Sequence, residues 1–211
     1  NTGFGNAGKA QLEKYASQYG IDIAAAETYD SSATDLTAVL TKLNSAGIEA
    51  VVNWSIVPAQ SIVPKNMKQL GMDVPLFQSH GFGNIKYVEA AGAAAEGIIF
   101  PAGRLLVAEK LPDTHPQKEN LAAYKTTYEE KFNEAVSTFG GHAYDAIMLV
   151  IEALKTSGST ERSDVRDALE SITGFPGTGG IFNMSASDHN GLGMDSLEML
   201  TVKNGEFDFY K

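Results

Sequence analysis

Hydrophobic and polar positions in the first hundred residues alternate between helical and strand-like spacing. Apolar residues that recur every three or four positions predict helices, and short continuous apolar runs between them predict strands. The expected helices are residues 5–20, 36–46, 58–70 and 84–91, and the expected strands are residues 21–29, 48–54, 74–78 and 97–100. Short links between helices and strands in this alternation are typical of a doubly wound parallel sheet.

Glycine and proline mark the boundaries of these elements. Gly20, Gly47 and Gly71 follow predicted helices, where a glycine C-cap is expected. Pro58 opens a helix, and Pro101 is expected to end the fourth strand. The glycine-rich turn before the first helix would normally follow a strand, so the sheet is expected to lack a member beside its centre.

The remainder of the chain changes character at residue 102. An irregular link is expected up to residue 116, followed by helices over 117–133, 143–156 and 162–172. Because no strand separates these helices, their apolar faces need a partner outside the chain or pack on each other. Residues 177–180 predict a flexible turn, and the last strands are expected at 181–184, 197–202 and 207–210, with a hairpin at Asn204-Gly205.

Composition narrows the possible partners and chemistry. The net charge of −10 argues against nucleic acid or an anionic membrane as a partner, and 43% hydrophobic residues suffice for a core. The absence of cysteine excludes disulfides, thiolate metal sites and cysteine nucleophiles. No apolar run approaches the roughly 18 residues of a membrane span. A start on the turn residues Asn1-Thr2-Gly3, without a signal-peptide pattern, is expected of a processed or cut product.

The first residues carry a glycine pattern with two interpretations. Gly3, Gly5 and Gly8 fit G-x-G-x-x-G, which can hold a phosphate at a helix N-terminus, and Glu27 lies where an acidic residue could bind a ribose hydroxyl. This would indicate a fragment of an NAD-binding dehydrogenase. Alternatively, Gly5 and Gly8 only allow a close approach of the helix to the sheet.

Aromatic residues and one histidine follow the strands that are expected to surround a ligand cleft. Ligands of open α/β sheets bind beyond the carboxyl ends of the strands, where Phe4, Trp54, Ser55, His80 and Phe82 are expected. Such a cleft floor suits a small organic ligand with a flat or apolar body. The structural alternatives are a core tryptophan that covers the end of its strand and a hydrogen-bonded loop histidine.

Other candidate chemistry is weaker. His142 and Asp145 are spaced i, i+3 on a helix and could share a metal, but no third ligand lies nearby in sequence. Capping of the helix N-terminus at an exposed position is the alternative interpretation. Serine, histidine and aspartate occur without a nucleophile elbow, so no catalytic residue and no metal site are assigned.

Short blocks in a fixed order carry a resemblance to a known family. They are Thr2-Gly3-Phe4-Gly5, Leu70-Gly71-Met72, Val74-Pro75-Leu76, His80-Gly81-Phe82-Gly83-Asn84, Ala94-Ala95-Glu96-Gly97, Ala143-Tyr144-Asp145-Ala146 and Lys203-Asn204-Gly205. In these blocks the chain resembles the periplasmic solute-binding proteins of ABC importers, within the branched-chain amino acid (leucine/isoleucine/valine-binding) group of type I fold.

The resemblance implies two lobes that trap a ligand between them. Residues 1–104 and 182–211 resemble the C-terminal lobe, and residues 105–181 resemble helices and crossovers of an N-terminal lobe whose sheet is not in this chain. It further implies a transport protein rather than an enzyme, with no cofactor and with an ABC membrane permease as partner. The intact protein would be a periplasmic or extracellular monomer, with or without a lipid anchor. A sensor ectodomain shares the fold, but would need a membrane span or a signalling domain.

The resemblance also implies ligand-binding residues. The C-terminal lobe of the family supplies an aromatic at the position of Phe4 and loop residues near Ser55 and Ile56, and amino-acid binders have an acidic residue at the position of His80. Histidine does not neutralise an ammonium group, so this departure favours an aromatic or keto carboxylic acid over a branched-chain amino acid. The predicted ligand-binding residues are Phe4, Trp54, Ser55, Ile56, His80, Gly81 and Phe82.

Overall fold

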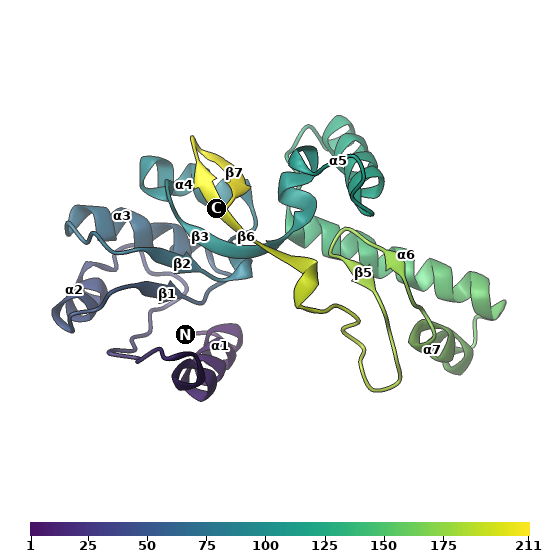
Figure 1. Cartoon of the computed structure of the whole chain (residues 1–211), viewed down its shortest axis with the longest axis horizontal. Helices are drawn as coiled ribbons and strands as arrows, with labels where there is room; N and C mark the ends of the chain where they lie inside the picture. The colour runs from purple at the N-terminus through teal and green to yellow at the C-terminus, as the bar shows by residue number, and fades with distance from the viewer. The chain divides into compact units, whose positions relative to one another are not determined.

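A five-stranded sheet in the order β1-β2-β3-β6-β7 organises the α/β fold (Figure 1). A computed structural model describes residues 1–211. The chain divides into two compact units, of which unit 1 comprises Asn1–Pro101 with Met199–Lys211 and unit 2 comprises Ala102–Glu198. No helix combines the length and the apolar character that crossing a bilayer would require.

Three parallel strands form one side of this sheet. They are β1 (Val51–Asn53), β2 (Leu76–Gln78) and β3 (Ile99–Gly103). Val51 is paired with Leu76, and Phe77 is paired with Ile99. The predicted parallel sheet is therefore confirmed for this part of the fold.

An antiparallel hairpin completes the sheet. Strands β6 (Leu197–Lys203) and β7 (Glu206–Phe209) pair as predicted around Asn204-Gly205, and both turn residues have positive φ (56° and 77°), as a two-residue hairpin requires. The Glu96 carboxylate accepts hydrogen bonds from the backbone N–H groups of Asn204 (2.9 Å) and Gly205 (2.6 Å). These bonds tie the turn to the segment that precedes β3.

The helices of unit 1 lie close to their predicted ranges. They are α1 (Gly3–Tyr15), α2 (Thr37–Ser45), α3 (Ile62–Gln69) and α4 (Ile85–Ala91). The Oγ1 of Thr2 accepts from the N–H of Gly5 (3.1 Å) and caps α1. Gly20, Gly47 and Gly71 adopt positive φ after their helices, as expected. Short 3₁₀ turns occur at Ala16–Tyr19, Pro58–Ser61, His80–Phe82, Gly92–Ala95, Arg104–Lys110 and Met194–Ser196.

The structure corrects three predictions for unit 1. Residues 21–29 do not form a strand: they join no sheet, and Ile21 and Ile23 are exposed. The predicted buried strand at 48–54 is short, and Val52 is exposed because β1 is the end strand of the sheet. Pro101 does not end β3, which continues to Gly103, because the fixed φ of proline is compatible with an extended backbone.

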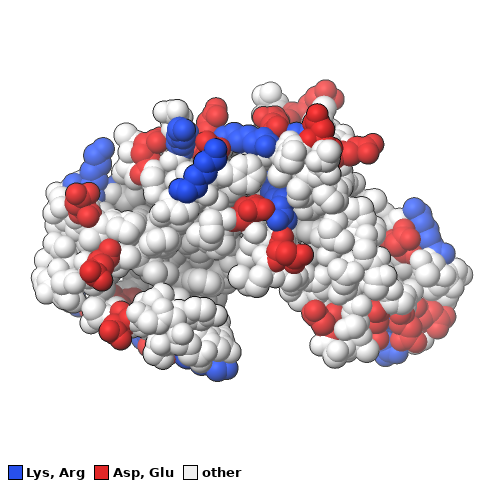
Figure 2. All heavy atoms as spheres, in the orientation of Figure 1, with Lys and Arg blue, Asp and Glu red and all other residues white.

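Unit 2 contains the predicted helices. They are α5 (Lys118–Phe132), α6 (Thr138–Ser157) and α7 (Arg162–Glu170), accompanied by the short pair β4 (Phe175–Pro176) and β5 (Ile181–Phe182). The link after residue 102 is not wholly irregular, because residues 104–110 form 3₁₀ turns. Helix α6 begins five residues earlier than predicted, where Ser137 accepts from the N–H of Gly140 (3.3 Å). Figure 2 shows acidic side chains gathered over α7.

The loop from Gly177 to Gly180 is a buried anchor rather than the predicted flexible turn. All four of its residues are buried. The Asp145 carboxylate on α6 accepts from the N–H of Thr178 (2.7 Å), from its hydroxyl (3.0 Å) and from the N–H of Gly179 (2.7 Å). Asp145 is therefore not the exposed capping residue that the sequence suggested, since it is 1% exposed.

Helix α6 is apolar around most of its circumference. One side carries the buried residues Gly141, Asp145, Leu149 and Ala153. Leu149 belongs to a core with Ile172 and Phe182. The other side leaves large apolar residues exposed, namely Ile147 (61%), Val150 (40%), Ile151 (37%) and Leu154 (36%). A helix that is hydrophobic all round is normally covered on both sides, so this face lacks a partner in unit 2.

Candidate functional site

Three aromatic rings meet at one end of the sheet in unit 1. The rings of Phe4 and Trp54 are stacked, with centroids 6.0 Å apart and an interplanar angle of 28°. The His80 imidazole stands edge-on to both, with centroids 5.3 Å from Phe4 and 6.1 Å from Trp54. We call these three side chains the ring cluster.

The ring cluster is assembled from three separate segments. Phe4 lies in the first turn of α1, Trp54 directly follows β1, and His80 follows β2 after Ser79. Carboxyl ends of parallel strands meet at the same edge of a sheet, which brings Trp54 and His80 together. Ser79 caps the turn that carries His80 by accepting from the N–H of Gly81 (3.3 Å).

A chain of buried amides fixes the strand ends behind the rings. The Nδ2 of Asn53 donates to the Oε1 of Gln78 (2.7 Å), and the Nε2 of Gln78 donates to the carbonyl of Gln60 (3.2 Å). The Nε2 of Gln60 then donates to the carbonyl of Gly81, also at 3.2 Å. These buried amides bond to one another or to backbone carbonyls, and they thereby link β1, β2 and the His80 turn. The Oε1 of Gln60 is buried without a hydrogen-bond partner.

Tyr29 joins this network from residues 21–29, which form neither helix nor strand. Its hydroxyl donates to the Oδ1 of Asn53 (2.9 Å). Burial raises the pKa of the Tyr29 phenol, and hydrogen bonds with Ser55 and Asn53 oppose that increase. The phenol therefore remains a protonated donor at neutral pH. Tyr29 could not be recognised from the sequence as part of the site, because its role depends on a contact across the sheet edge.

The structure separates the predicted ligand-binding residues by exposure. Phe4 and Trp54 are half-buried, whereas Ile56 and His80 are exposed. Ser55 is buried, and its hydroxyl accepts from the N–H of Val57 (3.2 Å) within its own loop. Gly81 is also buried, and a side chain there would collide with the Ser55 carbonyl and with Ile56. Ser55 and Gly81 thus shape the loops that carry the exposed residues.

Phe82 lies in the core of unit 1. Its side chain is 0% exposed, and its ring packs edge-on against Phe100 (5.3 Å between centroids) and is stacked with Tyr87 (6.1 Å). A ligand at the surface could not reach this ring without a rearrangement of the core. The sequence analysis predicted Phe82 as a ligand-binding residue because it lies two positions after His80. The directions in which neighbouring side chains of a turn point cannot be read from the sequence.

The arrangement is suited to binding rather than to a specific covalent step. Two aromatic faces offer dispersion contacts to a flat ligand, and an imidazole offers a hydrogen-bond donor or acceptor. The three side chains include no carboxylate that could pair with an ammonium group.

The glycine pattern at the start of the chain does not form an open phosphate cradle. Gly3, Gly5 and Gly8 all lie within α1, and Gly8 is covered by the Trp54 indole. Glu27 forms an ion pair with Lys42 (3.6 Å). The interpretation of Gly8 as a position of close approach is therefore supported by the structure.

The sequence profile of the family described as "Periplasmic binding protein" matches residues 1–206. The chain belongs to the periplasmic binding protein family. A curated relative from Pseudomonas aeruginosa, the "Leucine-, isoleucine-, valine-, threonine-, and alanine-binding protein", is 24% identical over 208 residues, which are 99% of this chain and 50% of that protein. This periplasmic binding protein chain thus spans half the length of that relative.

Solved structures of similar proteins share the fold. An extracellular ligand-binding receptor from Rhodopseudomonas palustris superposes with a TM-score of 0.93 at 24% identity, over 100% of this chain and 61% of the receptor. The branched-chain amino acid transporter substrate binding protein of Streptococcus pneumoniae, in complex with isoleucine, gives a TM-score of 0.77 at 28% identity, over 95% of this chain and 54% of that protein. The type I periplasmic binding protein fold is therefore confirmed for this chain.

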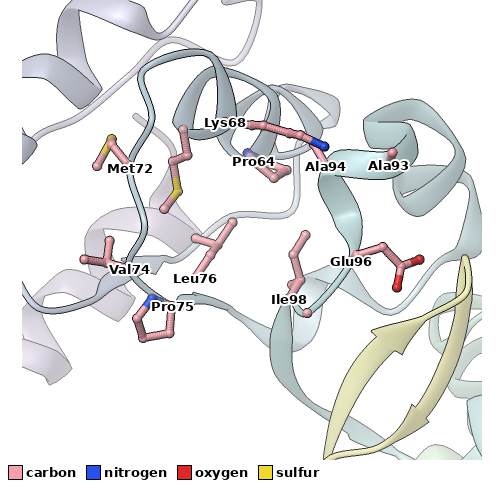
Figure 3. A pocket seen from close by; sticks show the side chains of 12 residues that line it. Pro64, Lys68, Met72, Val74, Pro75, Leu76, Ala93, Ala94, Glu96 and Ile98 are labelled. Carbon is pink, nitrogen blue, oxygen red and sulfur yellow. The ribbon is translucent and has the colours of Figure 1, made fainter.

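A concave site of this periplasmic binding protein lies at the other end of β2 from the ring cluster. It has a volume of about 360 Å³ and is lined mainly by apolar residues of α3, the start of β2 and the segment before β3 (Figure 3). Leu76 and Ile98 line its floor, with Lys68 at its edge. The Glu96 carboxylate is engaged by the hairpin turn. Nothing in its lining indicates a specific ligand.

Proposed function

We propose that this chain is part of an extracytoplasmic solute-binding protein of an ABC importer and that its ring cluster binds a small carboxylic acid. Family membership supports the transport role, a membrane permease as partner and a periplasmic or extracellular location. The observation that carries the ligand class is the Phe4–Trp54–His80 ring cluster. It favours an aromatic or keto acid over a branched-chain amino acid, because the ring cluster contains no carboxylate to pair with an ammonium group.

The lobe assignment is a further part of this proposal. The exposed face of α6 and the greater length of the relatives support a lobe in which residues 105–181 pack on a sheet from outside these 211 residues. Residues 1–104 and 182–211 would form the other lobe, with the ring cluster as its contribution to ligand binding.

Substitution of Ile147 by lysine tests the lobe assignment. In the natural full-length protein, Ile147→Lys is expected to lower the free energy of unfolding by about 2 kcal/mol or more, because it would bury a charge against an apolar sheet. In the 211-residue chain it should have little effect, since Ile147 is exposed there. Thr156→Lys, at an exposed polar position of α6, is the control. Equal unfolding midpoints for the two lysine variants of the full-length protein would contradict the assignment.

Isothermal titration of the natural full-length protein tests the ligand class. Phenylpyruvate, 4-hydroxybenzoate, L-leucine and L-phenylalanine are the probes, with NAD as the test of the dehydrogenase alternative. We expect an aromatic or keto acid to bind at least about tenfold more tightly than either amino acid, a difference of about 1.4 kcal/mol. Tight binding of L-leucine with His80 in place would contradict the proposed ligand class, and NAD binding would contradict the proposed function.

The same titrations on His80→Glu test the role of the imidazole. A carboxylate at this position should favour an ammonium group and repel a carboxylic acid, so the preference should shift towards the amino acids by about tenfold. Ser17→Glu adds the same charge at an exposed position beyond the end of α1 and is the control. If both glutamate variants bind the four probes alike, His80 does not determine the ligand class.

A further inference from the structure

Helix α1 carries the aromatic ring of Phe4 and the side-chain-free position Gly8 on the same face. Phe4 and Gly8 are four residues apart, so they lie one turn apart on one side of the helix. The Trp54 indole fills the gap over Gly8 while its ring stacks on Phe4. Gly8 is the only buried residue of α1. The one fully buried residue of this helix therefore contacts a member of the ring cluster.

The contact leaves no room for any side chain at position 8. A Cβ atom on Gly8 would lie well under 3.0 Å from the Cδ1, Cγ and Nε1 atoms of Trp54. These atoms belong to the five-membered ring next to the tryptophan Cβ, so the indole cannot avoid the clash by a small movement of its far end. It would have to change rotamer, or α1 would have to move away from β1. Either movement separates Trp54 from Phe4.

We infer that Gly8 is the positioning residue of the ring cluster: its missing side chain sets the orientation of Trp54 against Phe4 and His80. The role is distinct from helix formation, because alanine is the better helix former by about 1 kcal/mol and would be favoured there if only the helix mattered. Gly3 and Gly5 do not share this role. A Cβ atom on Gly3 would have no neighbouring atom within 4 Å, and one on Gly5 would make only contacts of 3.4 Å.

Trp54 is the only tryptophan of the chain, so its fluorescence reports the ring cluster directly. In the 211-residue chain, Gly8→Ala is expected to shift the Trp54 emission maximum, to change its near-ultraviolet circular dichroism and to raise acrylamide quenching at least twofold. Gly3→Ala, in the same helix, should leave all three signals unchanged. Unaltered Trp54 signals in Gly8→Ala, with far-ultraviolet spectra like those of the wild type, would overturn the inference.

Unfolding midpoints provide a second test that does not depend on fluorescence. With Trp54 present, Gly8→Ala should lower the midpoint because the indole is displaced. In a Trp54→Leu background the same substitution should raise the midpoint, since the clash is relieved and alanine favours the helix. A change of the same sign in both backgrounds would show that Gly8 does not act through Trp54.

The consequence for ligand binding rests on the proposed function. For the probe that binds wild-type full-length protein most tightly, Gly8→Ala should weaken binding at least tenfold, whereas Gly3→Ala should not. If none of the carboxylate probes binds the wild type, the proposed function fails while the spectroscopic test of Gly8 still stands. If a probe binds and Gly8→Ala retains full affinity with a displaced Trp54, Gly8 has no role in the ligand site.

Discussion

Replacement of Phe82 by alanine is expected to lower the free energy of unfolding by about 3–5 kcal/mol. The ring is 0% exposed and packs against Phe100 and Tyr87, and Phe100 in turn contacts Phe207 of β7 (5.2 Å between centroids). Its removal would leave a cavity between the turn after β2, strand β3 and the hairpin. Urea unfolding followed by far-ultraviolet circular dichroism measures the loss.

Two milder variants separate stability from ligand binding. Phe82→Leu retains most of the volume, so it should cost only about 1 kcal/mol and leave the affinity for a bound carboxylate probe within about threefold of wild type. Phe4→Leu should clearly weaken ligand binding and change the free energy of unfolding little. The reason is that Phe4 is half-buried and belongs to the ring cluster. A tenfold loss of affinity in Phe82→Leu at unchanged stability would show that Phe82 contacts the ligand.

Replacement of Asp145 by alanine is expected to destabilise unit 2 by about 3 kcal/mol or more. The substitution removes the acceptor of three hydrogen bonds and leaves the N–H groups of Thr178 and Gly179 buried without a partner, each at a cost of about 1–3 kcal/mol. Asp145→Asn should be intermediate, because one carboxylate oxygen is replaced by an NH₂ group that faces a donor. Amide hydrogen exchange of Thr178 and Gly179 gives the local readout.

An exposed aspartate of the same unit provides the control for Asp145. Asp167 on α7 is 63% exposed and paired with Arg166, so Asp167→Ala should change stability by less than about 1 kcal/mol. Slow exchange at Thr178 and Gly179 in Asp145→Ala, together with a wild-type unfolding midpoint, would show that the loop is held by its packing rather than by the carboxylate.

The glycine-rich loop from Gly177 to Gly180 shows why a local sequence pattern can predict the wrong role for glycine. Four residues rich in glycine predict flexibility, yet here glycine serves close packing. A side chain at Gly177 would lie 2.9 Å from the Asp145 carboxyl carbon, and one at Gly141 would lie 2.6 Å from the Thr178 hydroxyl. The i, i+3 pair of His142 and Asp145 suggested a metal from the helix alone. The partners of Asp145 are instead backbone amides more than thirty residues further along the chain.

The sequence by itself predicted most of the helices, the parallel strands and the terminal hairpin, because spacing of apolar residues, glycine caps and Asn-Gly turns act locally. The family followed from the resemblance of short blocks in a fixed order. It also placed Phe4, Trp54 and His80 at one edge of the sheet, since carboxyl ends of parallel strands coincide. The tertiary structure decided which neighbouring side chains face outward or inward: His80 is exposed while Phe82 is core. Residues 21–29 form no strand because a strand requires a neighbouring strand to pair with, which the sequence alone does not show. The Trp54 indole packs over Gly8 because two segments that are distant in sequence meet in the folded chain.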